Sequence, residues 1–272
     1  MVKNLLHLLF YKNILSIETL TIKYLEIMNT KENRETFIAR LTRKFNKEDI
    51  DEIMLAYDLS KEGHRTHKRD TGERYFEHPR AGVLIILDEL NWYDKDAIIA
   101  FLLHDTGEDT PLFGSNKTTF EEFVRTATFR ITKIFNRKVA EFVIGLTKPF
   151  IDNIQFINKK EVTEYYLNGL SGDLEISLLK KVDRLHNLRT SPTDLDSISK
   201  TRRTVKETIE VYLPLFKSIE AKDEKAKMKN SLIKKIEDEC KRLEKEITPE
   251  REKSLRKKSN KKWDEISELC KP

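Results

Sequence analysis

Glycine and proline are scarce in this chain, which contains 8 glycines and 7 prolines among its 272 residues. Both residue types interrupt helices, and both are needed in large numbers for the turns of all-β folds. Apolar residues recur at intervals of three and four along most of the sequence, which places them on one face of a helix. The sequence therefore predicts an all-α fold built from long helices.

The helical pattern divides the chain into three predicted regions. Residues 1–29 form an N-terminal extension, and Met28 is an alternative natural start. Its apolar opening is too short to cross a bilayer and lacks the small-residue cleavage site of a signal peptide. Residues 30–220 have the length of a single helical domain. Residues 221–272 form a charged helical extension that is rich in Lys and Glu.

The apolar residues of this extension are spaced as in a short heptad seam. They are Ile233, Ile236, Cys240, Leu243 and Ile247. We expect a helical hairpin that packs on the domain or on a partner, so the C-terminal helices could join two copies into a homo-oligomer. Because the charges of the extension are mixed in sign, they predict a solvated face rather than a nucleic-acid arm.

Net charge and cysteine content indicate which ligands and which kinds of chemistry to expect. A net charge of +5 permits an anionic ligand without requiring a nucleic acid. The two cysteines, Cys240 and Cys270, lie near the C-terminus and away from the polar clusters described below. This excludes thiol chemistry at those clusters, and such sparse cysteine usage predicts a cytoplasmic protein in a reducing compartment.

The segment Phe101–Thr110 begins apolar and ends in closely spaced ionisable side chains, which include His104. On a helix, Asp105, Glu108 and Asp109 share one face, because residues three and four apart are neighbours. Carboxylates that follow an apolar run are unstable without a compensating cation. A divalent metal is the simplest such cation, and imidazole with carboxylate suits Mn, Fe or Zn.

Residues 60–79 lose the helical periodicity and become basic and polar. Pro79 suits the first position of the next helix, which places His78 at its N-terminal end. A lone histidine there more often caps or packs than binds a metal, so both interpretations remain open.

Asp183 lies inside the apolar helical pattern of residues 174–190. A buried aspartate is uncommon without a partner. A salt bridge to Arg184 or Arg189 explains it as well as a metal does. Asn187 shares its face, since it follows four residues later.

Taken in order, these segments resemble the HD-domain phosphohydrolases, and specifically the hydrolase domain of the RelA/SpoT-type alarmone enzymes. The similarity covers roughly residues 50–220. Each piece alone is common, but the ordered set is specific. The matching segments fall within Ala56–His64, Lys68–Tyr75, His78–Pro79, Leu102–Thr110, Gly145–Lys148, Val182–Asn187 and Glu207–Leu215.

This resemblance implies an HD-domain helical bundle and a role for each matching residue. The implied metal ligands, with Mn²⁺ the usual ion at one per chain, are His78, His104, Asp105 and Asp183. Two acids, Glu108 and Asp109, match the pair that handles the attacking water. The implied guanosine pocket contains Arg69, Thr71, Asn187 and Thr190, and Lys68 is a further cation suited to phosphate oxygens.

The family removes the 3′-pyrophosphate of ppGpp or pppGpp and leaves GDP or GTP. This chain departs from the family at Asp70, where a second basic residue is usual, and at Arg74, where proline is usual. An acid beside the base pocket keeps another phosphorylated nucleotide, such as ppApp or NADPH, as an alternative substrate. A non-catalytic alarmone sensor is a further alternative, and a nucleic-acid binder ranks last. No synthetase domain is expected in the tail, so we expect a small stand-alone hydrolase.

Overall fold

The computed structural model describes residues 33–114, 119–148, 150–151, 154–155, 173–222 and 231–269. The chain divides into two compact units, Met1–Met54 and Leu55–Pro272. The predicted N-terminal extension, residues 1–29, lies outside the described residues. The domain bounds expected near residues 30 and 220 therefore stay predictions.

The described part of the first unit consists of helix α3, Arg34–Leu41, and the start of α4, Lys47–Gly63. A capping box begins α3: the Asn33 side chain accepts a hydrogen bond from the Thr36 backbone N–H at 2.9 Å, and the Thr36 hydroxyl accepts one from Asn33 at 2.9 Å. At α4 the side chain of Asn46 accepts from the Asp49 N–H at 2.8 Å. Asn46 therefore caps the N-terminus of α4.

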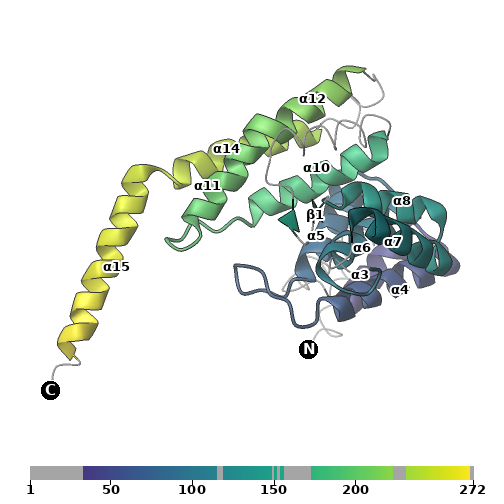
Figure 1. Ribbon diagram of the computed structural model, residues 1–272, viewed down its shortest axis with the longest axis horizontal. Coiled ribbons are helices and arrows are strands. Elements are labelled where there is room, and N and C mark those ends of the chain that lie inside the picture. The colour runs from purple at the N-terminus through teal and green to yellow at the C-terminus, as the bar shows by residue number, and fades with distance from the viewer. Residues whose placement is uncertain are drawn as a thin grey trace, which may run out of the picture. The chain divides into compact units, whose positions relative to one another are not determined.

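The second unit is helical, with one short antiparallel pair of strands among the described residues (Figure 1). The strands β1 and β2 pair Phe150 with Gln155 and Ile151 with Ile154. The all-α prediction is confirmed. The remaining elements are α5 (Glu77–Leu84), η1 (Ile85–Glu89), α6 (Lys95–Asp109), α7 (Phe120–Ile134), α8 (Arg137–Leu146), β1 (Phe150–Ile151), β2 (Ile154–Gln155), α10 (Leu174–Arg189), α11 (Ile198–Glu207), η2 (Thr208–Tyr212), α12 (Leu213–Lys222), α14 (Ser231–Glu246) and α15 (Pro249–Leu269).

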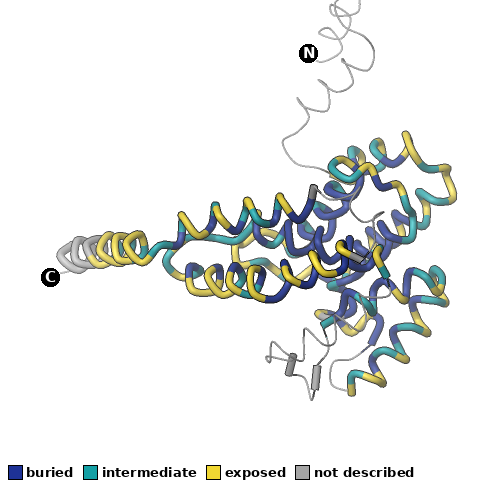
Figure 2. The backbone as a smooth tube through the Cα atoms, turned by 90° about the horizontal axis from the view of Figure 1, so that it is seen from above, coloured by how far each residue is buried: buried dark blue, intermediate teal, exposed yellow. Residues whose placement is uncertain are grey.

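Helix α10 is the central element of this unit. It packs against α5, α6 and α8 on one side and against α11, α12 and α14 on the other (Figure 1). Most of its residues are buried. Figure 2 shows the buried residues of this unit in dark blue, gathered in its interior. The Asp173 side chain fixes its start by accepting from the backbone N–H of Glu175 at 2.8 Å. A polar side chain on α10 is therefore held in a water-poor environment.

Helices α5 and α6 approach closely because a glycine lies between them. A Cβ atom built on Gly82 would lie 1.9 Å from the Phe101 ring, so no larger residue fits without movement. Gly82 follows His78 by one turn of α5, and Phe101 precedes His104 on α6. The close approach therefore brings both histidines near one another.

The C-terminal extension is helical and charged, as predicted. Helix α14 buries one apolar stripe, which includes Leu232, Ile236 and Leu243, each with 0% exposure. Polar side chains flank the stripe, and Lys235 forms an ion pair with Glu89 at 2.6 Å. Helix α14 thus belongs to the core of the second unit. The side chains of residues 261–272 lie outside the described part.

No helix within the described residues has the length and apolar character required to cross a membrane.

Candidate active site

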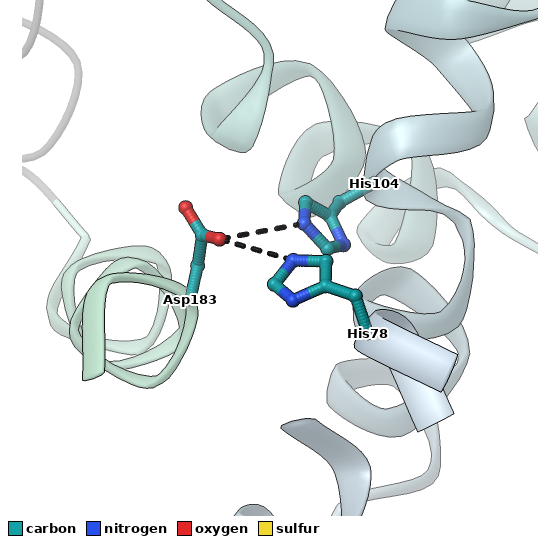
Figure 3. Close-up of side chains that lie close together, drawn as sticks. All are labelled: His78, His104 and Asp183. Carbon is teal, nitrogen blue, oxygen red and sulfur yellow. Dashed lines mark ion pairs between the residues drawn. The ribbon is translucent and has the colours of Figure 1, made fainter. Parts of the chain in front are cut away.

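Three side chains from three helices meet in the interior of the second unit (Figure 3). They are His78 on α5, His104 on α6 and Asp183 on α10, all buried. The Oδ1 atom of Asp183 lies 3.2 Å from Nε2 of His78 and 3.8 Å from Nε2 of His104. One atom from each residue lies within 4.8 Å of the others, so together they could hold one metal ion.

Asp105 joins this cluster from α6. Its carboxylate oxygens lie 3.1 Å from Nε2 of His104 and 3.4 Å from Nε2 of His78. The fold therefore brings together all four residues for which the sequence predicts metal binding. Their roles as ligands remain predictions.

The partner of the second nitrogen of His104 fixes its tautomer. Nδ1 lies 2.7 Å from the carbonyl oxygen of Phe101, which can only accept, so Nδ1 carries the proton. In the neutral ring, Nε2 then presents a lone pair toward two carboxylates. This buried atom has no hydrogen-bond partner among the described residues. A cation between Nε2 and the carboxylates would satisfy all three groups, so the residues present fit a divalent metal.

His78 is oriented by a second histidine. Its Nδ1 lies 2.7 Å from Nδ1 of His186, and both rings are buried. Burial lowers the pKa of His186 to about 2, so its ring is neutral and can accept a hydrogen bond. A proton on Nδ1 of His78 would be donated to His186, which leaves Nε2 of His78 for a metal.

Helix α5 begins at Glu77, two residues earlier than the sequence predicts. The backbone N–H groups of Glu77 and His78 donate to the carbonyls of Arg74 and Tyr75, so the turn forms before Pro79. The proline occupies the first turn, where its missing N–H costs nothing. His78 still lies at the N-terminal end of the helix, but its ring faces the carboxylates and makes no cap.

Asp183 is held by two further residues of its own helix. The side-chain amide of Asn187 donates to Oδ1 at 2.7 Å, and the ammonium group of Lys180 lies 3.0 Å from Oδ2. Burial alone would raise the pKa of Asp183, but Lys180 and the two histidines hold it well below the usual range. The carboxylate is therefore anionic.

The salt bridges expected as an alternative for Asp183 go elsewhere. Arg184 pairs with Glu207 at 3.2 Å, and Arg189 pairs with Glu89 at 2.5 Å. The basic partner of Asp183 is Lys180 instead, one turn earlier on α10.

The electrostatics of the cluster favour a positive charge at its centre. Burial would lower the pKa of His104, yet the carboxylates of Asp105 and Asp183 raise it well above its ordinary value. Conversely, burial would raise the pKa of Asp105, yet His104 and His78 hold it well below the usual range. The cluster thus retains cations, and a metal ion is a cation that all these ligands can share.

A cavity of about 420 Å³ extends from this cluster. Its wall includes His78, Asp105 and Asp183. All five predicted substrate-binding residues also line it, namely Lys68, Arg69, Thr71, Asn187 and Thr190. Metal ligands and predicted nucleotide contacts therefore share one cavity, although the contacts remain predictions.

Arg69 lies in a tight hairpin turn between α4 and α5. The turn is closed by hydrogen bonds from the Arg69 N–H to the Glu73 carbonyl and from the Tyr75 N–H to the His67 carbonyl, and it requires Gly72 at a φ of +81°. The Arg69 guanidinium donates to Asn187 at 2.9 Å and to Thr190 at 3.3 Å. Asn187 therefore links Arg69 to Asp183.

The predicted catalytic acids occupy the end of α6. Asp109 lines the cavity, and burial together with the nearby Asp105 charge raises the pKa of its carboxyl. A raised pKa suits a group that accepts a proton near neutral pH. The backbone of Glu108 continues α6, while its side chain lies outside the described part.

Several residues that line the cavity were not predicted from the sequence to belong to the site. They are Lys148, Lys180, Arg184, Ser197, Lys200, Thr201 and Thr204. Lys180 precedes Asp183 by three residues, so helical spacing could have identified it. The residues of α11 share one face at intervals of three and four, but the sequence alone does not tell which helix face meets a cavity.

Comparison with known proteins gives a consistent result. The family model described as "HD domain" matches residues 56–218. The bifunctional (p)ppGpp synthase/hydrolase SpoT of Escherichia coli K12 is 33% identical over 175 residues, which cover 62% of this chain and 22% of SpoT. The guanosine-3′,5′-bis(diphosphate) 3′-pyrophosphohydrolase of Aquifex aeolicus is 39% identical over 168 residues, which cover 61% of this chain and 21% of that protein.

A relative with a different name matches the same extent of chain. The GTP pyrophosphokinase rsh of Brucella melitensis is 35% identical over 176 residues, which cover 62% of this chain and 21% of its own length. The chain thus spans about a fifth of the length of these curated relatives. Among solved structures, a metazoan SpoT orthologue aligns with 63% of this chain and 94% of its own at 19% identity, with a TM-score of 0.40, too weak a likeness to support an argument.

The matched residues 56–218 make up more than half of the chain and contain the four clustered side chains and the lining of the cavity. The predicted resemblance is confirmed, and the chain belongs to the HD domain family.

Proposed function

We propose that the chain hydrolyses the 3′-pyrophosphate of ppGpp or pppGpp and releases GDP or GTP with pyrophosphate. The observation that carries this proposal is one cavity that joins a His–His–Asp cluster to a wall of cationic and polar side chains. The names of the Escherichia coli and Aquifex aeolicus relatives agree with it. Because the match covers only about a fifth of the length of those relatives, their other activities are not transferred.

His78, His104, Asp105 and Asp183 would hold one divalent metal, for which we propose Mn²⁺. Such a metal lowers the pKa of a water molecule and polarises a phosphate oxygen. Imidazole and carboxylate ligands suit Mn²⁺, although they also suit Fe or Zn. The protein contributes the orientation of each ligand, through the Phe101 carbonyl for His104 and through His186 for His78.

The carboxylate of Asp109, with Glu108 as its predicted companion, would accept a proton from the attacking water. The water oxygen forms a bond to the phosphorus attached to the 3′ oxygen of the ribose, and the bond between that phosphorus and the 3′ oxygen breaks. The 3′ oxygen takes up a proton as pyrophosphate leaves. A base whose pKa is raised toward neutrality, as that of Asp109 is, performs such a transfer more effectively.

The remaining residues of the cavity would bind and orient the nucleotide. The guanidinium plane of Arg69 can stack on a base, while Asn187 and Thr190 hold it in place. Lys68, Lys148 and Lys180 line the cavity and can neutralise phosphate oxygens. A substrate with several phosphates is therefore favoured over a neutral nucleoside. The sparse cysteines remain the argument for a cytoplasmic location.

A second candidate function is hydrolysis of another phosphorylated nucleotide. The observation that favours it is Asp70, an acid on the wall of the cavity where the family usually has a base.

To distinguish the two candidate functions, the purified protein is incubated with ppGpp, ppApp and NADPH, with and without Mn²⁺, and the products are resolved by ion-exchange chromatography. Release of GDP and pyrophosphate from ppGpp is expected. Turnover of another nucleotide alone would retain the site and change the substrate, and no turnover despite bound metal would favour a sensor.

Two variants test the proposed division between metal ligand and proton acceptor. Asp183→Ala should lose both the bound metal and activity, because it removes a charged ligand. Glu108→Ala should retain the metal, measured by elemental mass spectrometry, and lose turnover. Asp196→Ala, which changes an exposed aspartate that does not line the cavity, serves as the control. Normal metal content and activity in Asp183→Ala would refute the site.

A further inference from the structure

An ion pair joins two walls of the cavity at a place that the proposed chemistry leaves unexplained. Asp70 comes from the tip of the hairpin turn, and Lys200 comes from α11. Their side chains meet at 2.5 Å, and both residues line the cavity. An acid and a base that face the same cavity can each contact a ligand, with opposite effects on an anion.

This ion pair is exposed and therefore weak. The side chain of Lys200 is 62% exposed and that of Asp70 is 47% exposed. Water screens a pair of this kind, and its two charges separate at little cost. The link can thus be exchanged for a stronger interaction when a ligand enters.

Three other cations of the cavity have less accessible partners. Lys180 is buried against Asp183, and Arg184 is buried against Glu207. Arg69 is hydrogen bonded to Asn187 and Thr190. Among these cations, Lys200 has the partner that is most easily displaced by an incoming anion.

A guanosine tetraphosphate carries a diphosphate on each side of its ribose. If the 3′-diphosphate lies at the metal cluster, the 5′-diphosphate must lie elsewhere along the cavity. The wall at α11 contains Lys200 and Thr204, together with Ser197, the residue just before the helix. Ammonium and hydroxyl groups are suitable donors for phosphate oxygens.

We propose that Lys200 binds the 5′-phosphate end of the nucleotide. In the absence of nucleotide the Asp70 carboxylate occupies Lys200, and the 5′-phosphate displaces this carboxylate from Lys200 when it binds. The proposal rests on the proposed function, since it assumes that the 3′ end occupies the metal cluster. Asp70 then lowers the affinity for 5′-phosphorylated nucleotides without contacting them. It thereby determines specificity, and its removal should improve binding.

The test measures binding without turnover. The dissociation constants of GDP and of guanosine are determined by isothermal titration calorimetry for the wild type, Lys200→Met, Asp70→Asn and the double variant. Lys200→Met should weaken GDP binding roughly tenfold or more, because it removes a charged donor. Asp70→Asn should strengthen GDP binding about two- to fivefold, the range for an exposed pair. Guanosine binding should change in neither variant.

The double variant distinguishes two ways in which Asp70 could weaken GDP binding: by occupying Lys200, or by repelling the phosphates directly. If Asp70 acts through Lys200, then Asp70→Asn should have no effect on GDP binding once Lys200 is Met. Lys206→Met and Glu73→Gln are matched controls, because they change the same charges on α11 and on the hairpin outside the cavity lining. Both controls should bind GDP as the wild type does.

Opposite effects of the two single variants on GDP, absent for guanosine, support the proposal even if ppGpp is not hydrolysed. Equal weakening by both variants, or weakening for guanosine as well, would mean that the pair only holds the hairpin in place, and this would overturn the proposal. Absence of GDP binding in the wild type would overturn it too. The proposed function is tested separately, by measuring whether the protein hydrolyses ppGpp.

Discussion

At the scale of single residues, His186 decides how His78 presents its metal-facing nitrogen. The 2.7 Å contact between the two Nδ1 atoms is buried, so it is protected from competing water. Replacing His186 with Phe should weaken metal binding about 10- to 100-fold, because His78 loses the partner that fixes its proton. A competition titration with a chelator measures this.

The conservative variant His186→Gln tests whether the hydrogen bond is responsible. A glutamine can still accept a proton from Nδ1 of His78, so part of the metal affinity should return. Equal loss of affinity in His186→Phe and His186→Gln, with unchanged thermal stability, would contradict a role in orientation.

His64 should make stability depend on pH. Its ring is buried, its Nε2 lies 3.4 Å from the Thr106 hydroxyl, and burial lowers its pKa to about 4 from an ordinary value of 6.5. Between these pH values the unfolded chain binds a proton that the folded chain does not. The free energy of unfolding should therefore fall as the pH decreases from 6.5 to 4, by about 1.4 kcal/mol per pH unit at most.

Denaturant titrations at several pH values measure this dependence. The variant His64→Gln cannot be protonated, so its free energy of unfolding should fall less steeply over the same range. Parallel curves for the wild type and His64→Gln would show that other groups cause the dependence.

At the scale of elements, the contact between α5 and α6 depends on Gly82. An added Cβ would overlap the Phe101 ring, so Gly82→Ala must push the two helices apart. Overpacking of this kind costs about 1–3 kcal/mol, and it should also weaken metal binding because His78 and His104 move apart. Thermal unfolding and metal titration measure the two effects.

A compensating variant makes this prediction specific. Phe101→Leu removes the ring that the new methyl group meets, so the double variant Gly82→Ala/Phe101→Leu should regain metal affinity relative to Gly82→Ala. If the double variant binds metal more weakly than the sum of both changes predicts, the clash is not the cause.

The sequence predicts individual helices, but it does not predict which faces of distant helices meet. Helical spacing was sufficient to predict α10 and to place Asn187 on the face of Asp183. The same spacing exists on α11, but whether Lys200 faces solvent or a cavity depends on how distant helices pack. An arginine partner for Asp183 was one of two interpretations that the sequence left open, and this one was wrong. Arg184 pairs with Glu207 and Arg189 pairs with Glu89, and neither acid could be identified as a partner from the sequence.

At the scale of the whole molecule, α14 should be required for stability. Its residues Leu232, Ile236 and Leu243 are fully buried, and loss of even one such side chain costs about 2–5 kcal/mol. Truncation after Ala221 removes them all and exposes the faces of α10, α11 and α12 against which α14 packs. We expect loss of cooperative thermal unfolding, monitored by circular dichroism.

Truncation after Ile247 provides the control, because it removes α15 and retains α14. The described side chains of α15 are mostly exposed, so the midpoint of thermal unfolding should change little. Cooperative unfolding in both truncations would contradict the role of α14. Light scattering on the full chain and on the control also tests the predicted homo-oligomer, which should depend on the C-terminal helices.

The family and the fold class were predictable because they depend on local patterns. The family was predicted from the order of short segments between Ala56 and Leu215. The all-α fold was predicted from the scarcity of glycine and proline. The partners of the proposed ligands were not predictable. His186 orients His78, and the Phe101 carbonyl orients His104, through contacts that only the packed interior determines.

Helix α10 carries Asp183 and Asn187, and Thr190 is the residue that caps its C-terminus; all three line the cavity. The seven residue-to-residue steps from Asp183 to Thr190 span about 10 Å at the fixed rise of a helix. One inserted or deleted residue would turn everything beyond it by about 100° and carry Thr190 away from the cavity. Insertions and deletions that adapt this fold to longer or shorter nucleotides should therefore occur in the hairpin turn that carries Arg69 and Asp70, while the length of α10 stays constant.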